Sequence, residues 1–104
     1  MSDPSAPEIV TVDDVAAAHD RIADVAHRTP LDVSTTFAEM SGAASVGLKL
    51  ENMQRTGSFK IRGAYNTMAQ LPDDVKERGV VASSAGNHAQ GVALAGDLLD
   101  IDTT

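Results

Sequence analysis

The stretch VGLKLENMQRTGSFKIRGAYNTMAQL, residues 46–71, decides how the rest of the chain is arranged. Apolar residues alternate with other residues over Val46–Leu50, which is the period of a strand. After a polar turn, Ser58 is a suitable helix cap, and Pro72 ends the pattern that follows. The apolar positions in between recur every three or four residues, at Ile61, Ala64, Tyr65, Met68 and Leu71. The stretch therefore predicts a strand followed by a helix.

The same order is repeated downstream. After a charged one-turn connection over Asp73–Arg78, the short apolar run Val80–Ala82 suits a buried parallel strand. A small-residue loop and a second helical pattern from His88 to Leu99 follow it, and Asp100–Thr104 resembles the approach to a third strand. Parallel neighbours need a helix to carry the chain back, so the sequence predicts an α/β unit, a partial open parallel sheet with flanking helices.

The part before residue 46 predicts two helices. Thr11 and Asp14 form the pattern of a capping box, and the apolar spacing that follows predicts a helix over Val12–Ala26. His27 to Pro30 closes this helix, because proline disfavours helix at the residue before it. A short helix is expected around Thr36–Met40, ending at a Gly42 turn.

Composition sets the outer limits. A chain of 104 residues predicts one domain, with residues 1–10 as a disordered lead and 11–104 as the folded part. The formal charge of −7 disfavours nucleic acid and anionic membranes as partners. The chain contains no cysteine, its polar first ten residues do not resemble a secretory signal, and no window has the length of a membrane span. We therefore expect a soluble cytoplasmic protein.

Lys60 is the first candidate for chemistry. It lies near the positive end of the expected helix dipole, which disfavours an ammonium and favours the free amine, and Arg62 acts in the same direction. A lysine held as a free amine is a Schiff-base nucleophile. The alternative from position alone is an ordinary solvated lysine.

The loop SSAGNHAQG, Ser83–Gly91, is the second candidate. Ligands of open α/β sheets bind beyond the carboxyl ends of strands, and the free N–H groups of a helix start attract carboxylates and phosphates. The loop therefore predicts an anion site, although its polar side chains could equally serve as helix caps. Adjacent parallel strands would bring Lys60 and Asn87 to one edge of the sheet.

The two segments ENMQRTGSFKIRGAYN, residues 51–66, and SSAGNHAQGVALA, residues 83–95, resemble signature segments of the pyridoxal-phosphate-dependent threonine/serine dehydratases, or threonine ammonia-lyases. TPLDVS at Thr29–Ser34 resembles the lead-in of the same family. The resemblance covers most of residues 11–104. It implies a fold of the tryptophan-synthase β type and pyridoxal 5′-phosphate as cofactor.

The resemblance also implies roles for particular residues. Lys60 would hold the cofactor as a Schiff base and then remove the substrate's α proton, with Phe59 packed beside it. Asn87 would hydrogen-bond the cofactor's 3-hydroxyl. A loop of five residues would receive the substrate carboxylate, and Gln90 would brace it; the five are Ser84, Ala85, Gly86, Asn87 and His88. The β-elimination of threonine or serine would yield a 2-oxo acid and ammonia.

Small differences favour the dehydratases among similar enzymes. Sulfhydrylases of the cysteine-synthase type usually read GNTG where this chain has GNHA. Serine racemases share GNH but carry immediately before it a serine that reprotonates the opposite face; here that residue is Ala85. The resemblance thus favours elimination over racemisation.

The family's glycine-rich phosphate loop and the partner of the pyridine nitrogen have no counterpart in these 104 residues. We therefore expect the leading part of a larger catalytic domain, inactive or nearly so alone, with exposed apolar surface. The full-length enzymes of the family are commonly homo-oligomers. The alternative is a non-catalytic α/β module that binds a partner.

Overall fold

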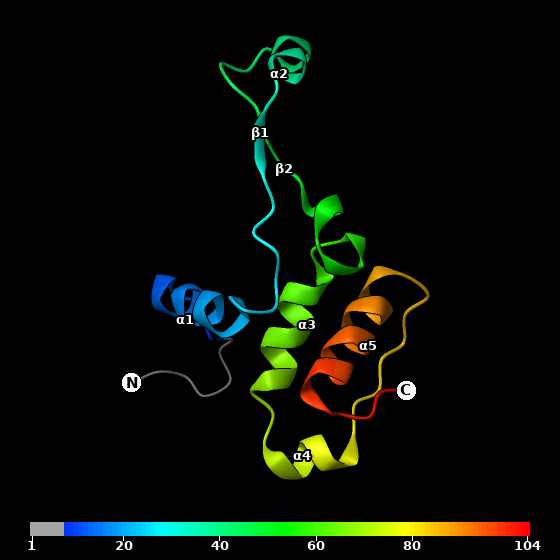
Figure 1. The fold of residues 1–104 in the computed structure, drawn as a ribbon. Coiled ribbons are helices and arrows are strands. Elements are labelled where there is room, and N and C mark those ends of the chain that lie inside the picture. The colour runs from blue at the N-terminus through cyan, green and yellow to red at the C-terminus, as the bar shows by residue number, and fades with distance from the viewer. Residues whose placement is uncertain (1–7) are drawn as a thin grey trace.

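The computed structural model describes residues 8–104, and Figure 1 shows its elements. In chain order these are α1 (Val12–Ile22), β1 (Leu31–Val33), α2 (Thr35–Ser41), β2 (Gly47–Lys49), the 3-10 turns η1 (Glu51–Met53) and η2 (Arg55–Gly57), α3 (Lys60–Ala69), α4 (Asp73–Arg78) and α5 (Asn87–Leu99). Most of the lead expected to be disordered, residues 1–7, lies outside the described residues. Residues 8–10 of that lead are exposed and belong to no helix or strand.

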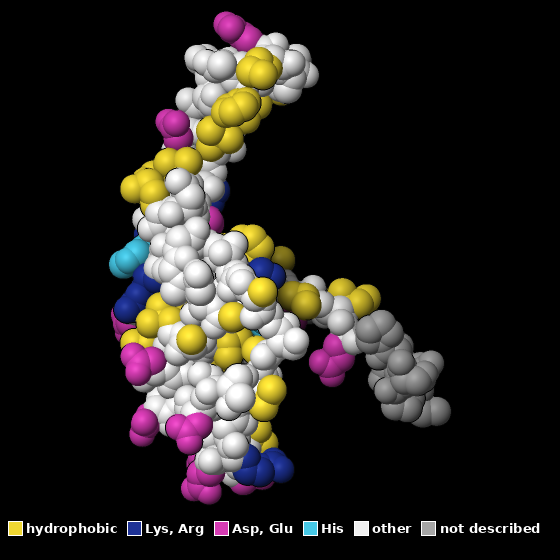
Figure 2. Space-filling view, turned by 90° about the vertical axis from the view of Figure 1, so that its right-hand side faces the viewer, with side chains coloured by type: hydrophobic (Ala, Val, Ile, Leu, Met, Phe, Trp, Pro, Cys, Tyr) yellow, Lys and Arg dark blue, Asp and Glu magenta, His cyan; other side chains and the backbone are white. Residues whose placement is uncertain are grey.

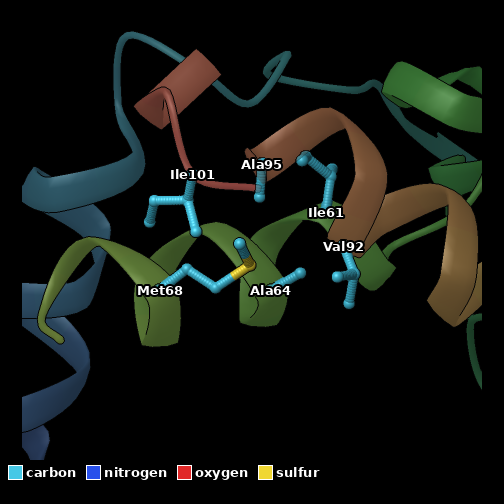
Figure 3. Close-up of a cluster of buried hydrophobic side chains, with 6 residues drawn as sticks. All are labelled: Ile61, Ala64, Met68, Val92, Ala95 and Ile101. Atoms are coloured by element: carbon cyan, nitrogen blue, oxygen red, sulfur yellow. The ribbon is translucent and has the colours of Figure 1, made fainter. Parts of the chain in front are cut away.

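Helices α3 and α5 lie side by side and enclose the core (Figures 1 and 3). The buried cluster consists of Ile61, Ala64, Met68, Val92, Ala95 and Ile101. Ile61 is fully buried, with no exposed surface. The apolar spacing that predicted both helices is thus the spacing that packs them against each other.

A single parallel bridge, between Val80 and Thr103, forms where the sequence predicts a strand near residue 80. The Val80 N–H donates to the Asp102 carbonyl at 2.8 Å, and the Thr104 N–H donates back to the Val80 carbonyl at 3.0 Å. The chain therefore has the expected α/β character. The charged connection before Val80 has the predicted bounds, Asp73–Arg78, and forms the short helix α4.

The other predicted strand pairs differently from the expectation. β2 pairs antiparallel with β1, with Leu31 opposite Lys49 and Val33 opposite Gly47. The expectation that Val46–Leu50 lies beside Val80–Ala82 in one parallel sheet is therefore wrong for the described residues. A three-residue strand such as β1 has too few positions to show a period in the sequence.

The segment from β1 to β2, residues 31–49, forms an arm that projects from the helices (Figure 1). It carries α2 at its tip, which the Ser34 hydroxyl caps. The helix ends at Gly42, with φ 74°, as the sequence predicts. The radius of gyration is 17.2 Å, against about 13 Å for a compact chain of this size. The expected exposed apolar surface is found on the arm (Figure 2), at Leu31, Val33, Phe37 and Met40.

Helix α1 begins as predicted but ends early. The capping box is confirmed, because Thr11 and Asp14 each accept the other's N–H. The helix ends at Ile22 rather than at Ala26. The Gln54 side chain forms hydrogen bonds with both backbone groups of His27. It accepts the His27 N–H and donates to the His27 carbonyl, each at 2.8 Å. This tertiary contact draws the chain out of the helical path. No helix of residues 8–104 is long and apolar enough to cross a membrane.

Candidate active site

Lys60 is the first residue of α3, one residue later than a cap at Ser58 would give. Ser58 does not cap the helix in the predicted position, but its buried hydroxyl accepts the Lys60 N–H at 3.3 Å. The Lys60 Nζ lies 5.4 Å from the centre of the Phe59 ring, a distance at which a cation and an aromatic face attract. The predicted neighbours Phe59 and Lys60 are therefore together.

The Lys60 amine differs from the two other lysine amines of the chain. The Lys49 Nζ donates to the Thr29 carbonyl at 2.5 Å, and the Lys76 Nζ donates to the Ala69 carbonyl at 3.0 Å. Within residues 8–104, the Lys60 amine has no hydrogen-bond acceptor. It is thus the lysine amine left open to a ligand in the described part of the chain.

A cavity of about 610 Å³ lies beside this amine. Its lining includes Phe59, Lys60, Ser83 and His88, which belong to the two predicted segments. Apolar side chains of α3, of α5 and of the strand at residue 80 make the remaining wall, among them Ala64, Met68, Val80 and Val92. The two segments meet because α3 packs on α5, and not because β2 and the strand at residue 80 are neighbours in one sheet.

The loop before α5 is shaped by Ser84. Its hydroxyl accepts the N–H groups of Gly86 at 3.2 Å and Ala89 at 3.3 Å. The N–H groups of Asn87 and His88, at the start of α5, have no acceptor among residues 8–104. The loop thus presents free donors at a helix start, as the sequence predicts.

The remaining predicted residues of this loop lie next to the cavity in the chain without lining it. Ala85, Asn87 and Gln90 are exposed. The Gln90 N–H donates to the Gly86 carbonyl at 3.2 Å. The expected roles of these residues toward a cofactor or substrate stay predictions.

A network of polar side chains, here called the polar network, supports the segment that leads into Lys60. It consists of Thr29, Glu51, Gln54 and Arg62. Glu51 pairs with Arg62 and accepts the Thr29 hydroxyl at 2.6 Å. Gln54 is buried, with 4% of its surface exposed, and links this group to His27. The network ties the chain before the arm to the turns after it.

Nothing in the sequence reveals the polar network. Its members are spread over residues 29–62, and only Arg62 lies in a predicted helix. A hydrogen bond between residues far apart in the chain leaves no local pattern. The four side chains support the candidate site without lining its cavity.

The network has a marked electrostatic effect. The hydrogen bond and charge of Arg62 lower the pKa of Glu51 from 4.5 to about 2, and the same contact raises the pKa of Arg62. The Arg62 guanidinium also donates to the His27 carbonyl at 3.3 Å. The positive charge of Arg62, which the sequence places near Lys60, is therefore paired with the Glu51 carboxylate.

Known proteins resemble the chain over nearly its whole length. An L-threonine ammonia-lyase from Thermotoga maritima is 50% identical over 96 residues, which is 92% of this chain and 24% of that protein. The solved structure of maize serine racemase is 43% identical with a TM-score of 0.80, covering 88% of this chain and 29% of that one. The processed form of threonine deaminase isoform 2 from Solanum lycopersicum is 38% identical with a TM-score of 0.71, covering 94% and 28%.

The chain thus spans about a quarter of the curated ammonia-lyase. The sequence pattern of one family, described as "Pyridoxal-phosphate dependent enzyme", matches residues 22–104, which include both candidate segments. The two solved structures, at 43% and 38% sequence identity to this chain, support the predicted fold class. The chain therefore belongs to the family of pyridoxal-phosphate dependent enzymes.

Proposed function

We propose that the protein is a threonine/serine ammonia-lyase, with residues 11–104 as the leading part of its catalytic domain. The observation that carries the proposal is the Lys60 amine, free of any acceptor in the described chain, on a cavity shared with the loop that starts α5. The 50% identity to an L-threonine ammonia-lyase supports the choice of reaction. The substrate would be a small β-hydroxy amino acid.

The residues present fit pyridoxal phosphate. A primary amine is the group that condenses with the cofactor's aldehyde, and the cavity of about 610 Å³ lies in the usual range for sites of small ligands. The Phe59 ring stands beside the amine. Lys60 would hold the cofactor covalently, with Asn87 as a donor to its 3-hydroxyl.

When bound, the cofactor would supply an electron-withdrawing ring that stabilises negative charge at the substrate's α carbon. The chain's own residues would do the rest. The free N–H groups of Asn87 and His88 would bind the substrate carboxylate, within the loop that Ser84 holds in shape. The released Lys60 amine would take the α proton and pass it to the β hydroxyl, which would leave as water. Hydrolysis would then give the 2-oxo acid and ammonia.

Racemisation is the second candidate, favoured by the similarity to maize serine racemase. Racemisation needs an acid on the face of the α carbon opposite the base. The resemblance places that acid at residue 85, where this chain has Ala85. The Ser84 hydroxyl already accepts two N–H groups of the loop. Elimination is therefore the better supported reaction.

Trapping the cofactor on its lysine tests the proposal. The chain is incubated with pyridoxal phosphate and reduced with borohydride, and the pyridoxyl group is then mapped to Lys49, Lys60 or Lys76. We expect the pyridoxyl group mainly on Lys60. The absorbance of the bound cofactor should be lost in Lys60→Ala and retained in Lys76→Ala, the matched control. Equal labelling of all three lysines would contradict the proposal.

Product analysis separates the two reactions. The chain is supplied with L-threonine and L-serine, and both 2-oxo acid and D-serine are measured. We expect any turnover to give 2-oxo acid without D-serine, and expect Ala85→Ser to raise the D-serine share. D-serine as the main product of the unchanged chain would favour the racemase.

A further inference from the structure

We propose that Gly91 is a positioning residue for Lys60, because its missing side chain lets α5 lie directly against the backbone that carries the lysine. The proposal rests on the function proposed above for Lys60. It concerns a residue that lies on the other helix and outside the lining of the cavity.

The geometry at Gly91 is tight and involves only backbone. A Cβ placed on Gly91 would lie 3.0 Å from the Lys60 carbonyl carbon, 3.1 Å from its oxygen and 3.2 Å from the Ile61 nitrogen. Backbone atoms cannot rotate away as the end of a side chain can. An added methyl group would therefore push the start of α3 by several tenths of an ångström.

The start of α3 is held on two sides. Ile61, the next residue, is fully buried in the core. On the other side, the Ser58 hydroxyl holds the Lys60 N–H, and the buried Gln54 fixes the turn before it. A displacement of the Lys60 backbone therefore also moves the Cα from which its side chain extends. A reactive group has to be held within about 0.5 Å of its productive position.

Gly91 also couples Lys60 to the anion-binding loop. Residues four apart lie on the same side of a helix, and Asn87 lies four residues before Gly91. The contact at Gly91 therefore sets how far the Lys60 backbone lies from the free N–H groups at the start of that helix. Both parts of the site depend on the same close approach.

Gly96 provides a matched control on the same helix. It is buried like Gly91, and a Cβ there would clash with the Thr103 side chain and lie 2.8 Å from the Ile101 carbonyl oxygen. The clash would thus fall at the C-terminal end of α5, more than one turn from the contact with Lys60. Gly96→Ala should weaken the packing of α5 without moving the start of α3.

The test compares the unchanged chain, Gly91→Ala and Gly96→Ala. Each is incubated with pyridoxal phosphate in trimethylamine N-oxide, which favours the compact state. After borohydride reduction, the label on Lys60 is divided by the mean label on Lys49 and Lys76, and thermal unfolding is followed by circular dichroism. A merely structural role would lower the melting temperature without a specific change in this ratio.

We expect the ratio to fall about tenfold in Gly91→Ala and to stay near the unchanged value in Gly96→Ala, although both melting temperatures fall. A ratio retained in Gly91→Ala overturns the inference and leaves the proposed function standing. An equal loss in both variants also overturns it, since the effect would then be general unfolding. No preference for Lys60 in the unchanged chain would overturn the proposed function, and the inference with it.

Discussion

Replacing Glu51 by glutamine removes the charge at the centre of the polar network. The carboxylate pairs with Arg62 and accepts from Thr29 at 2.6 Å and from Gln54 at 3.4 Å. Its side chain is 17% exposed, against 31% for Arg62, so solvent screens the pair only in part. Glu51→Gln should therefore lower the free energy of unfolding at neutral pH.

The magnitude follows from the pKa of Glu51. Arg62, with smaller contributions from the hydrogen bonds of Thr29 and Gln54, lowers that pKa from 4.5 to about 2 in the folded chain. One pKa unit corresponds to about 1.4 kcal/mol, so the folded state gains at most about 3 kcal/mol from the ionised carboxylate. Hydrogen bonds to charged groups contribute about 1.5–3 kcal/mol by independent measures. We expect Glu51→Gln to lose about 2–3 kcal/mol at pH near 7.

The sign of the pH dependence is fixed by the direction of the pKa change. The pKa is lower in the folded than in the unfolded chain, so the stabilisation is complete above pH 4.5 and is lost as the pH falls through about 2. The difference in the free energy of unfolding between the unchanged chain and Glu51→Gln should therefore be largest above pH 4.5. It should disappear as the pH falls through about 2.

Urea denaturation followed by circular dichroism, at several pH values, measures this difference. Asp74→Asn is the matched control, since Asp74 forms an exposed ion pair with Arg78 at 3.7 Å and exposed pairs contribute little. A gap between the unchanged chain and Glu51→Gln that is the same at every pH would refute the reasoning. So would a neutral-pH stability of Glu51→Gln equal to that of the unchanged chain.

Three further predictions concern the fold. Ile61→Ala should lower the free energy of unfolding by about 2–5 kcal/mol in urea titrations, whereas Met40→Ala, 76% exposed, should change it little; equal losses would contradict the assigned core. Gln54→Ala should cost about 1–3 kcal/mol and speed hydrogen exchange at the His27 amide, and an unchanged exchange rate there would show that Gln54 does not hold it. Gly79→Ala should lower the melting temperature more than Gly42→Ala, because both glycines have positive φ but only Gly79 meets a backbone oxygen, 2.8 Å from an added Cβ; the reverse order would contradict this.

The sequence by itself determined the two core helices, the start of α1 and the family. Apolar spacing set α3 and α5, because the residues that repeat at three and four are those buried between the two helices. The capping pair at Thr11 and Asp14 set the start of α1. The two segments around Lys60 and Asn87 identified the family, since they join a lysine at a helix start to a small-residue loop.

Only the tertiary structure decided how these pieces meet. The end of α1 and the polar network depend on Gln54, which contacts His27 at a separation of 27 positions in the chain. The antiparallel arm depends on pairing between two three-residue strands that carry no period of their own. Gly91 reads as an ordinary helical residue until its contact with the Lys60 backbone is seen. Local patterns record how a residue faces a core, but they do not record which distant backbone lies against it.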